Sequence, residues 1–185
     1  METAASYTEA KIKTYGFETK INQCLCEFSL GSDQFIQMAQ MRSAPDRTTI
    51  PFEMVFMGPS DDDQYHLSII VSNHHRSIFR QFIIDRNPPH ADIDMRFTAP
   101  VELLYFFGPH FGDRFGIADY TFNALAENNL SVIASSFSSA SIFLVLPEHG
   151  ALKAKAVFSD RFEIPKTIQR PSFTPMNRRN RIREQ

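Results

Sequence analysis

A repeated order of strands and helices constrains the fold of this chain more than any other feature of its sequence. In the first half, apolar residues alternate over 21–30 and then recur at helical spacing after Gly31–Ser32. Two hairpin strands, a second helix and a closing strand follow. The expected strand, helix, two strands, helix and strand lie at 21–30, 32–42, 52–57, 65–72, 74–84 and 91–97.

The second half repeats this order. An apolar run precedes a helix in which Ile117, Thr121 and Leu125 share one face, and a strand pair, a weaker helix and a short strand follow. These elements are expected at 101–107, 116–128, 130–137, 141–146, 149–158 and 162–165. The sequence therefore predicts an α+β fold of two ferredoxin-like βαββαβ units, with antiparallel sheets and helices on one face.

The same order divides the chain into three parts. We expect a first unit with an N-terminal extension over 1–97, a second unit over 98–165 and a basic tail over 166–185. The whole chain has a net charge of −2, but the tail carries six Lys and Arg residues against one Glu. The folded part is therefore acidic, and the tail is the natural place for an interaction with an acidic surface.

Composition narrows the class of protein. The 185 residues are 43% hydrophobic and 12% aromatic, which is enough to bury a core and excludes a disordered chain. No apolar run is long enough to span a bilayer, and the N-terminus lacks the charged and apolar regions of a secretory signal. The sequence therefore predicts a cytoplasmic protein with no membrane association.

A resemblance to a known family rests on four segments of the second half: GDRFGIA, FNALAENNLSVI, SSFSSASIFLVL and FEIP. Together they resemble an ACT domain, of the regulatory kind found in tandem at the end of aspartokinases. The first half is similar to that family by topology alone. The resemblance implies a non-catalytic regulatory protein that binds an amino acid and forms a homodimer. Because the sequence contains no kinase segment, we expect a free-standing module or a subunit that acts on a separate protein partner.

The loop before the helix at 116–128 is the candidate ligand site. A helix N-terminus leaves backbone N–H groups unpaired and suits a carboxylate. Asp113 could meet an α-ammonium group and Arg114 an acidic side chain, although Asp113 could equally cap the helix while Arg114 stays in solvent. Where the resembled family often has Asn-Ile-Asn, this sequence has Asn-Leu-Ser at 129–131. The predicted ligand-binding residues are Gly112, Asp113, Arg114, Phe115, Gly116, Ile117 and Ser131.

Other reactive residues favour structural roles. Cys24 and Cys26 fall on one face of a strand and are expected in the core, since zinc would need two more ligands at matching spacing. The six histidines share no metal-ligand spacing. The serines of 135–141 lack the nucleophile elbow of a hydrolase, so they are expected to form a hairpin. We therefore expect no catalytic residues, no metal and no cofactor.

Two other function classes share this topology. A nucleic-acid binder could use the basic tail, but the strands lack the signature of RNA-recognition domains and the folded part is acidic, so nucleic acid is the less favoured partner. A dimeric ferredoxin-like enzyme could line an apolar pocket with some of the 18 Phe and 7 Met residues. Fold likeness alone does not choose among these classes.

Overall fold

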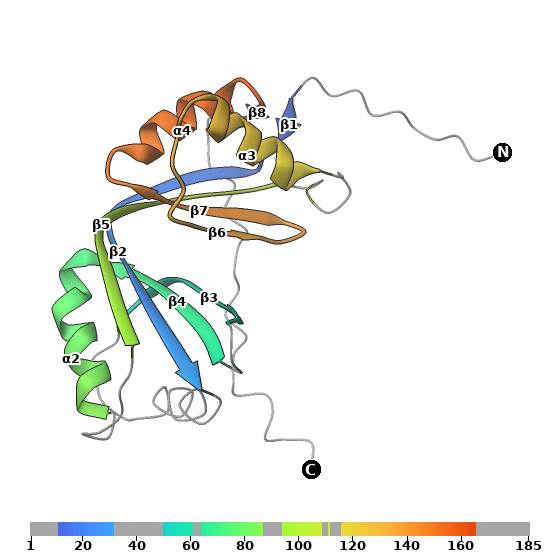
Figure 1. Cartoon of the computed structure of the whole chain (residues 1–185). Helices are drawn as coiled ribbons and strands as arrows, with labels where there is room; N and C mark the ends of the chain where they lie inside the picture. The colour runs from blue at the N-terminus through green and yellow to red at the C-terminus, as the bar shows by residue number, and fades with distance from the viewer. Residues whose placement is uncertain are drawn as a thin grey trace, which may run out of the picture.

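A computed structural model describes residues 11–31, 50–60, 64–86, 94–108, 111 and 116–165. Their main feature is an antiparallel sheet of six strands in the order β3-β4-β2-β5-β7-β6 (Figure 1). Two short strands, β1 and β8, pair in parallel beside it. The strands are β1 Ile12–Lys13, β2 Gly16–Gly31, β3 Phe52–Pro59, β4 Gln64–Ser72, β5 Asp94–Phe107, β6 Ala134–Phe137, β7 Ser141–Pro147 and β8 Phe162–Glu163.

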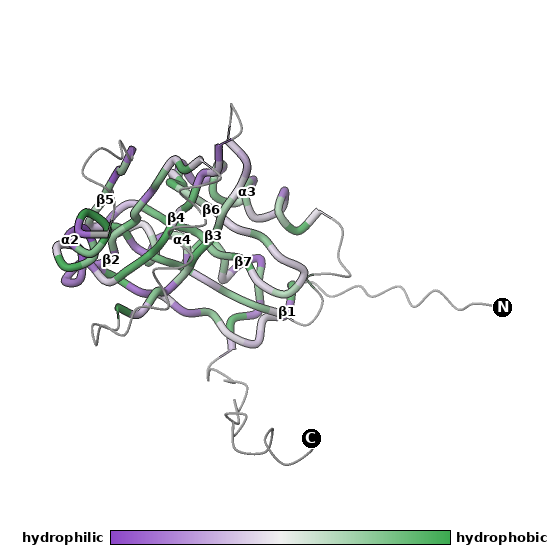
Figure 2. Tube along the Cα trace, turned by 90° about the horizontal axis from the view of Figure 1, so that it is seen from below, coloured by the Kyte–Doolittle hydropathy of each residue, from purple (hydrophilic) through white to green (hydrophobic). Residues whose placement is uncertain are grey.

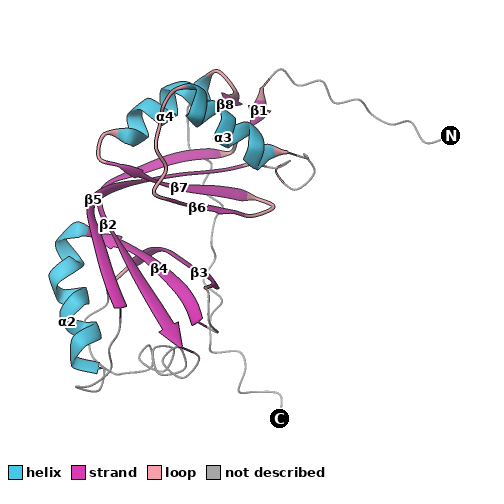
Figure 3. Cartoon of the chain, in the orientation of Figure 1, coloured by secondary structure: helices cyan, strands magenta, loops and turns pink. Residues whose placement is uncertain are grey.

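The helices lie on the outer face of the sheet. A short 3-10 turn, η1, leads into α2, which packs beside one half, whereas α3 and α4 cover the other half (Figure 3). Their bounds are η1 Asn73–His75, α2 Arg76–Arg86, α3 Ile117–Glu127 and α4 Gly150–Ser159. The predicted helices at 74–84, 116–128 and 149–158 are confirmed within a few residues, while the helix expected at 32–42 and the tail at 166–185 lie outside the described residues.

Two long strands, β2 and β5, run through both halves of the sheet. The start of β2 pairs with the end of β5, and the end of β2 pairs with the start of β5. Between these parts the register shifts from Lys20 to Leu25, and the sheet bends there (Figure 1). Such irregularities bend a strand without ending it.

The prediction of separate strands at 91–97 and 101–107 is wrong, because residues 94–97 and 101–107 belong to the single strand β5. Ala99 and Pro100 lie within this strand but have no register partner on β2. A proline is tolerated at such an irregular position because no ladder hydrogen bond needs its missing N–H. The expected unit boundary between 97 and 98 therefore falls inside a strand that both halves share.

The predicted α+β class with antiparallel pairing is confirmed. The six strands follow the order β3-β4-β2-β5-β7-β6, in which β2 and β5 are shared by the two halves, so two separate βαββαβ units are not confirmed. The described residues form one bent sheet in place of two separate sheets. The strand expected at 162–165 appears as β8, which pairs with β1 instead of joining this sheet.

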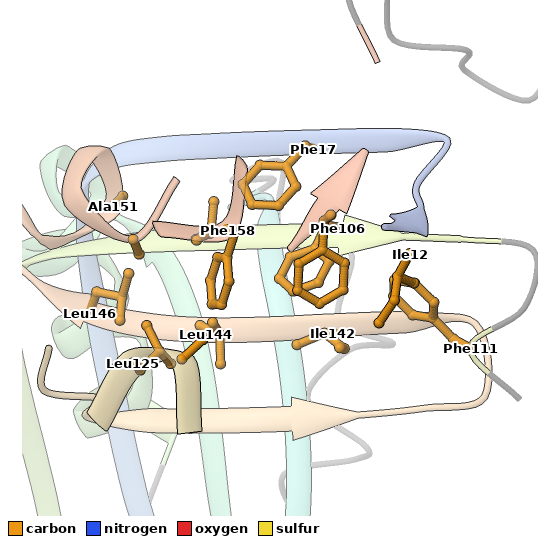
Figure 4. Packing of buried hydrophobic residues seen from close by; sticks show 14 residues of the cluster. Ile12, Phe17, Phe106, Phe111, Leu125, Ile142, Leu144, Leu146, Ala151 and Phe158 are labelled. Carbon is orange, nitrogen blue, oxygen red and sulfur yellow. The ribbon is translucent and has the colours of Figure 1, made fainter. Parts of the chain in front are cut away.

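Strand alternation sorts the apolar side chains onto two faces. On the outer face, Cys24, Cys26 and Phe28 pack with α2, and much of β4 shows the green of apolar residues in Figure 2. Around α3 and α4 a second outer cluster includes Phe106 and Phe158, whose rings lie 5.4 Å apart (Figure 4). Each half of the sheet thus has its own layer of buried side chains beneath its helices.

The inner face of the bend holds a third cluster. Leu25, Met54 and Ile70 from one half pack with Val101, Leu103 and Val145 from the other. The bend therefore brings the two halves of one sheet face to face. Because these residues are buried between the two halves, their packing fixes how the halves are placed relative to each other.

Candidate functional site

The base of the candidate loop is held by backbone contacts at the end of β5. Gly108 N–H donates to the carbonyl of Ala140 at 3.1 Å, and Tyr15 N–H donates to the carbonyl of Phe107 at 2.8 Å. A Cβ at Gly108 would lie 2.5 Å from the carbonyl oxygen of Lys13 and 2.6 Å from the Phe111 ring. Glycine at this position thus lets the N-terminal segment approach the loop closely.

Phe111 anchors the loop to the core. Its side chain is buried, and its ring meets that of Phe106 at 5.9 Å and that of Phe162 at 6.4 Å, both edge-on. Figure 4 shows this ring beside Ile12 of β1. The loop therefore leaves β5 from a packed, fixed position. Sequence reasoning missed this role of Phe111, because nothing in the local pattern shows which core an isolated loop aromatic enters.

The N-terminus of α3 is formed as the sequence predicted. Gly116 precedes the helix with φ 80°, and its carbonyl accepts the N–H of Tyr120 at 2.9 Å. No side-chain hydrogen bond caps this helix within the described chain, and a Cβ on Gly116 would meet nothing within 4 Å. The first-turn N–H groups carry the partial positive charge of a helix start.

The predicted site residues are only partly brought together. Gly116 and Ile117 lie at the start of α3, and Ile117 packs partly against the outer core. Ser131 is exposed and follows the other end of this helix, which is about 16 Å long at 1.5 Å per residue. A single ligand would not reach both ends within one chain. Gly112, Asp113, Arg114 and Phe115 lie outside the described residues.

The cysteines occupy the core, as predicted. Both are free and fully buried, with their Sγ atoms 3.8 Å apart. The hydrogen bond between them lowers the pKa of Cys24 and, together with burial, raises the pKa of Cys26. Because neither thiol reaches solvent, the pair packs as core and offers no accessible nucleophile.

The serines of 135–141 form a hairpin turn, as predicted. Ser138 Oγ lies 2.8 Å from Ser141 Oγ and accepts the N–H of Ser141 at 2.9 Å. In the part of the chain that the structure describes, no group of three or more His, Cys, Asp or Glu residues could hold a metal ion. None of the described helices is long and apolar enough to cross a membrane.

A shallow groove between the ends of α3 and α4 was not predicted. It encloses about 430 Å³ and is lined by Asn128, Ala156, Val157, Asp160 and Arg161. Arg161 pairs with Glu127, and its guanidinium lies 5.0 Å from the centre of the Tyr120 ring. Arg161, the cation among the described residues that line the groove, is therefore already neutralised by its own chain. Sequence patterns miss such a groove because it depends on how two helix ends meet.

Comparison with known proteins shows which solved structures have a similar fold. No family model and no curated protein matches the sequence. Among solved structures, the regulatory subunit of aspartate kinase from Thermus flavus is 14% identical, with a TM-score of 0.63 over 80% of this chain and 97% of that one. A putative C-terminal regulatory domain of aspartate kinase from Porphyromonas gingivalis is 13% identical, with a TM-score of 0.53 over 80% and 96%. The chain has the fold of an aspartokinase regulatory subunit.

A whole aspartate kinase contains a similar fold in part of its length. The enzyme from Synechocystis is 18% identical with a TM-score of 0.67, and the match covers 87% of this chain but 28% of that one. This chain thus corresponds to a fraction of that enzyme's length. The likeness to ACT-domain regulatory modules expected from GDRFGIA and the following segments is confirmed at the level of the fold.

Proposed function

We propose that this chain is a non-catalytic regulatory module that binds a small amino acid at the loop before α3. The observation that carries the proposal is the start of α3, where Gly116 adopts a left-handed conformation and no described side chain caps the helix. Backbone N–H groups at such a position bind carboxylates. The solved structures of the same fold support a regulatory role, since they are described as regulatory subunits or domains of aspartate kinases.

The ligand contacts of this proposal come from the segment 112–117. Gly112 and Gly116 allow close approach of the backbone, Asp113 pairs with the α-ammonium group and Arg114 with an acidic side chain of the ligand. Phe115 and Ile117 supply apolar contact. Since Ser131 lies at the far end of α3, it joins such a site only from a second copy of the chain, which fits a homodimer.

Regulation in this proposal acts through β5. This strand begins beside α2, passes the bend and ends at the base of the candidate loop. The sensing unit at 98–165 and the unit at 1–97 therefore share one rigid element. A ligand that binds one arrangement of the two halves more tightly shifts the population toward it, and a protein partner reads that shift.

Isothermal calorimetry and thermal unfolding with a panel of the common amino acids test this function. A ligand present at a hundred times its Kd should stabilise the chain by about 2.7 kcal/mol. Arg114→Ala and Asp113→Ala should abolish the response, whereas the matched control Lys153→Ala, on the exposed surface of α4, should keep it. Failure of every amino acid to bind or stabilise at millimolar concentration would refute the proposal.

A further inference from the structure

Residues 11–15 form a strap between the last described strand and the base of the candidate loop. Within this strap, β1 pairs in parallel with β8, which has no other partner among the described strands (Figure 1). At the end of the strap, Tyr15 N–H donates to the carbonyl of Phe107 at 2.8 Å, where β5 ends. The strap therefore joins two parts of the chain that are far apart in the sequence.

Contacts of three kinds fasten the first half of the strap. Ile12 N–H donates to the carbonyl of Arg161 at 3.1 Å, and Lys11 Nζ donates to that of Ser159 at 2.7 Å. Because Ser159 ends α4, the Lys11 cation also favours the negative end of the helix dipole. The side chain of Ile12 is buried in the outer cluster that contains Phe111 (Figure 4).

Thr14 makes a double contact with β8. Its hydroxyl donates to the carbonyl of Glu163 at 2.7 Å, and its N–H donates to the same carbonyl at 3.2 Å. The residue is only 6% exposed. A buried hydroxyl is costly without a hydrogen-bond partner, so Thr14 favours the arrangement in which the strap lies beside β8.

The base of the loop rests on this strap. Gly108 is buried, and its N–H donates to the carbonyl of Ala140 at 3.1 Å. It also lies against the strap, because a Cβ at this position would be 2.5 Å from the carbonyl oxygen of Lys13. Release of the strap would remove Lys13 from Gly108 and Ile12 from the cluster of Phe111. The position of the loop base therefore depends on the strap.

We propose that residues 11–15 hold the loop before α3 in its ligand-binding position, with Thr14 as a positioning residue. This inference rests on the proposed function, since it assigns a control element to the same amino-acid site. The strap contacts no ligand and acts through Gly108 and Phe111. Release of the strap lowers the affinity for the amino acid because only the closed form binds it. By linkage, the bound amino acid keeps the strap closed.

Amide hydrogen exchange in the whole chain without ligand, followed by NMR, tests the first part of the inference. Thr14→Val keeps the shape of the side chain but removes its donor, so the strap should open about fivefold more often. Exchange of the Tyr15 and Gly108 amide hydrogens should speed up by the same factor, because both lose their acceptors or their support on opening.

Two variants and one amide serve as controls. Thr14→Ser keeps the hydroxyl and should hold both rates within about twofold of the parent chain. Thr19→Val makes the same chemical change on an exposed part of β2 and should alter neither rate. The amide of Ser60, which donates to the carbonyl of Gln64 at 2.8 Å in the other half of the sheet, should keep its rate in every variant.

Addition of the amino acid tests the second part. At a hundred times its Kd, a ligand that needs the closed strap should slow exchange of the Ile12 and Thr14 amides about a hundredfold, because both exchange only after the ligand has left. The Ser60 amide should keep its rate, since its local opening leaves the site intact.

Each part can fail by itself. If Thr14→Val speeds up the Ile12 and Thr14 amides but leaves Gly108 at its parent rate, the strap does not hold the loop and the inference is refuted. An amino acid that binds without slowing the strap amides would show that the site does not need the strap. If no amino acid binds, the proposed function fails, while the rate at Gly108 still decides whether the strap holds the loop.

Discussion

Removal of the Glu102 carboxylate should loosen the attachment of α4 to the sheet. Glu102 lies on β5 with only 7% of its surface exposed, and its Oε2 accepts the N–H of Ala151 at 2.8 Å. His149, which precedes α4, has φ 66° and makes no side-chain cap hydrogen bond. The capping acceptor for this helix start therefore comes from a neighbouring strand, where a charged oxygen also favours the helix dipole.

The size of the loss in stability follows from the Ala151 N–H, which loses its hydrogen-bond acceptor when Glu102 is replaced. Glu102→Ala strands a buried N–H and removes a charged acceptor, so we expect a loss of about 2 kcal/mol. For a chain of this length that corresponds to a fall in Tm of about 4–8 °C. Glu102→Gln keeps an acceptor oxygen but loses the charge, and should cost about 1 kcal/mol or less.

Urea and thermal unfolding monitored by circular dichroism measure these changes. Glu148→Ala is the matched control, because this carboxylate is exposed just before the same helix, and we expect it to change the free energy of unfolding by less than about 0.5 kcal/mol. If Glu102→Ala and Glu148→Ala destabilised the protein equally, the capping role of Glu102 would be refuted.

Three further substitutions separate steric, conformational and packing effects. Gly108→Ala should destabilise by about 2 kcal/mol or more in urea unfolding, since its Cβ would meet backbone 2.5 Å away, and a neutral result would contradict the close approach. Gly116→Ala should cost about 1–2 kcal/mol for its left-handed backbone alone, because the space around it is open, and Gly116→Asn should cost less. Phe106→Ala should cost about 3–5 kcal/mol, as its ring packs on several others in the core, and a loss near that of a surface change would place it outside the core.

Local patterns predicted the elements whose causes are local. The alternation from Cys24 to Leu30 identified a strand with one buried face, and that face now packs against α2. Gly116 and the stripe of Thr121 and Leu125 located α3 within a residue at each end. These features depend on periodicity and on glycine in the left-handed region, which neighbouring residues determine.

Pairing between strands that are far apart in the chain could not be predicted from local sequence patterns. The sequence predicted two strands at 91–97 and 101–107, yet β5 continues through Pro100 because the strand is irregular opposite β2 there. β8 was expected in the main sheet, but β1 takes it as a partner from the opposite end of the chain. Likewise Ser131 was predicted to bind the same ligand as the loop residues, whereas the length of α3 separates the two within one chain.

By itself, the sequence determined the class of fold, the resemblance to aspartokinase regulatory modules and the helix start at Gly116, because composition, period and turn chemistry act over a few residues. Only the tertiary structure decided that one bent sheet joins both halves, that Phe111 anchors the loop and that Glu102 caps α4. These three features depend on contacts between residues far apart in the chain. Such contacts are selected by the packing of the whole molecule, where many local preferences have to agree at once.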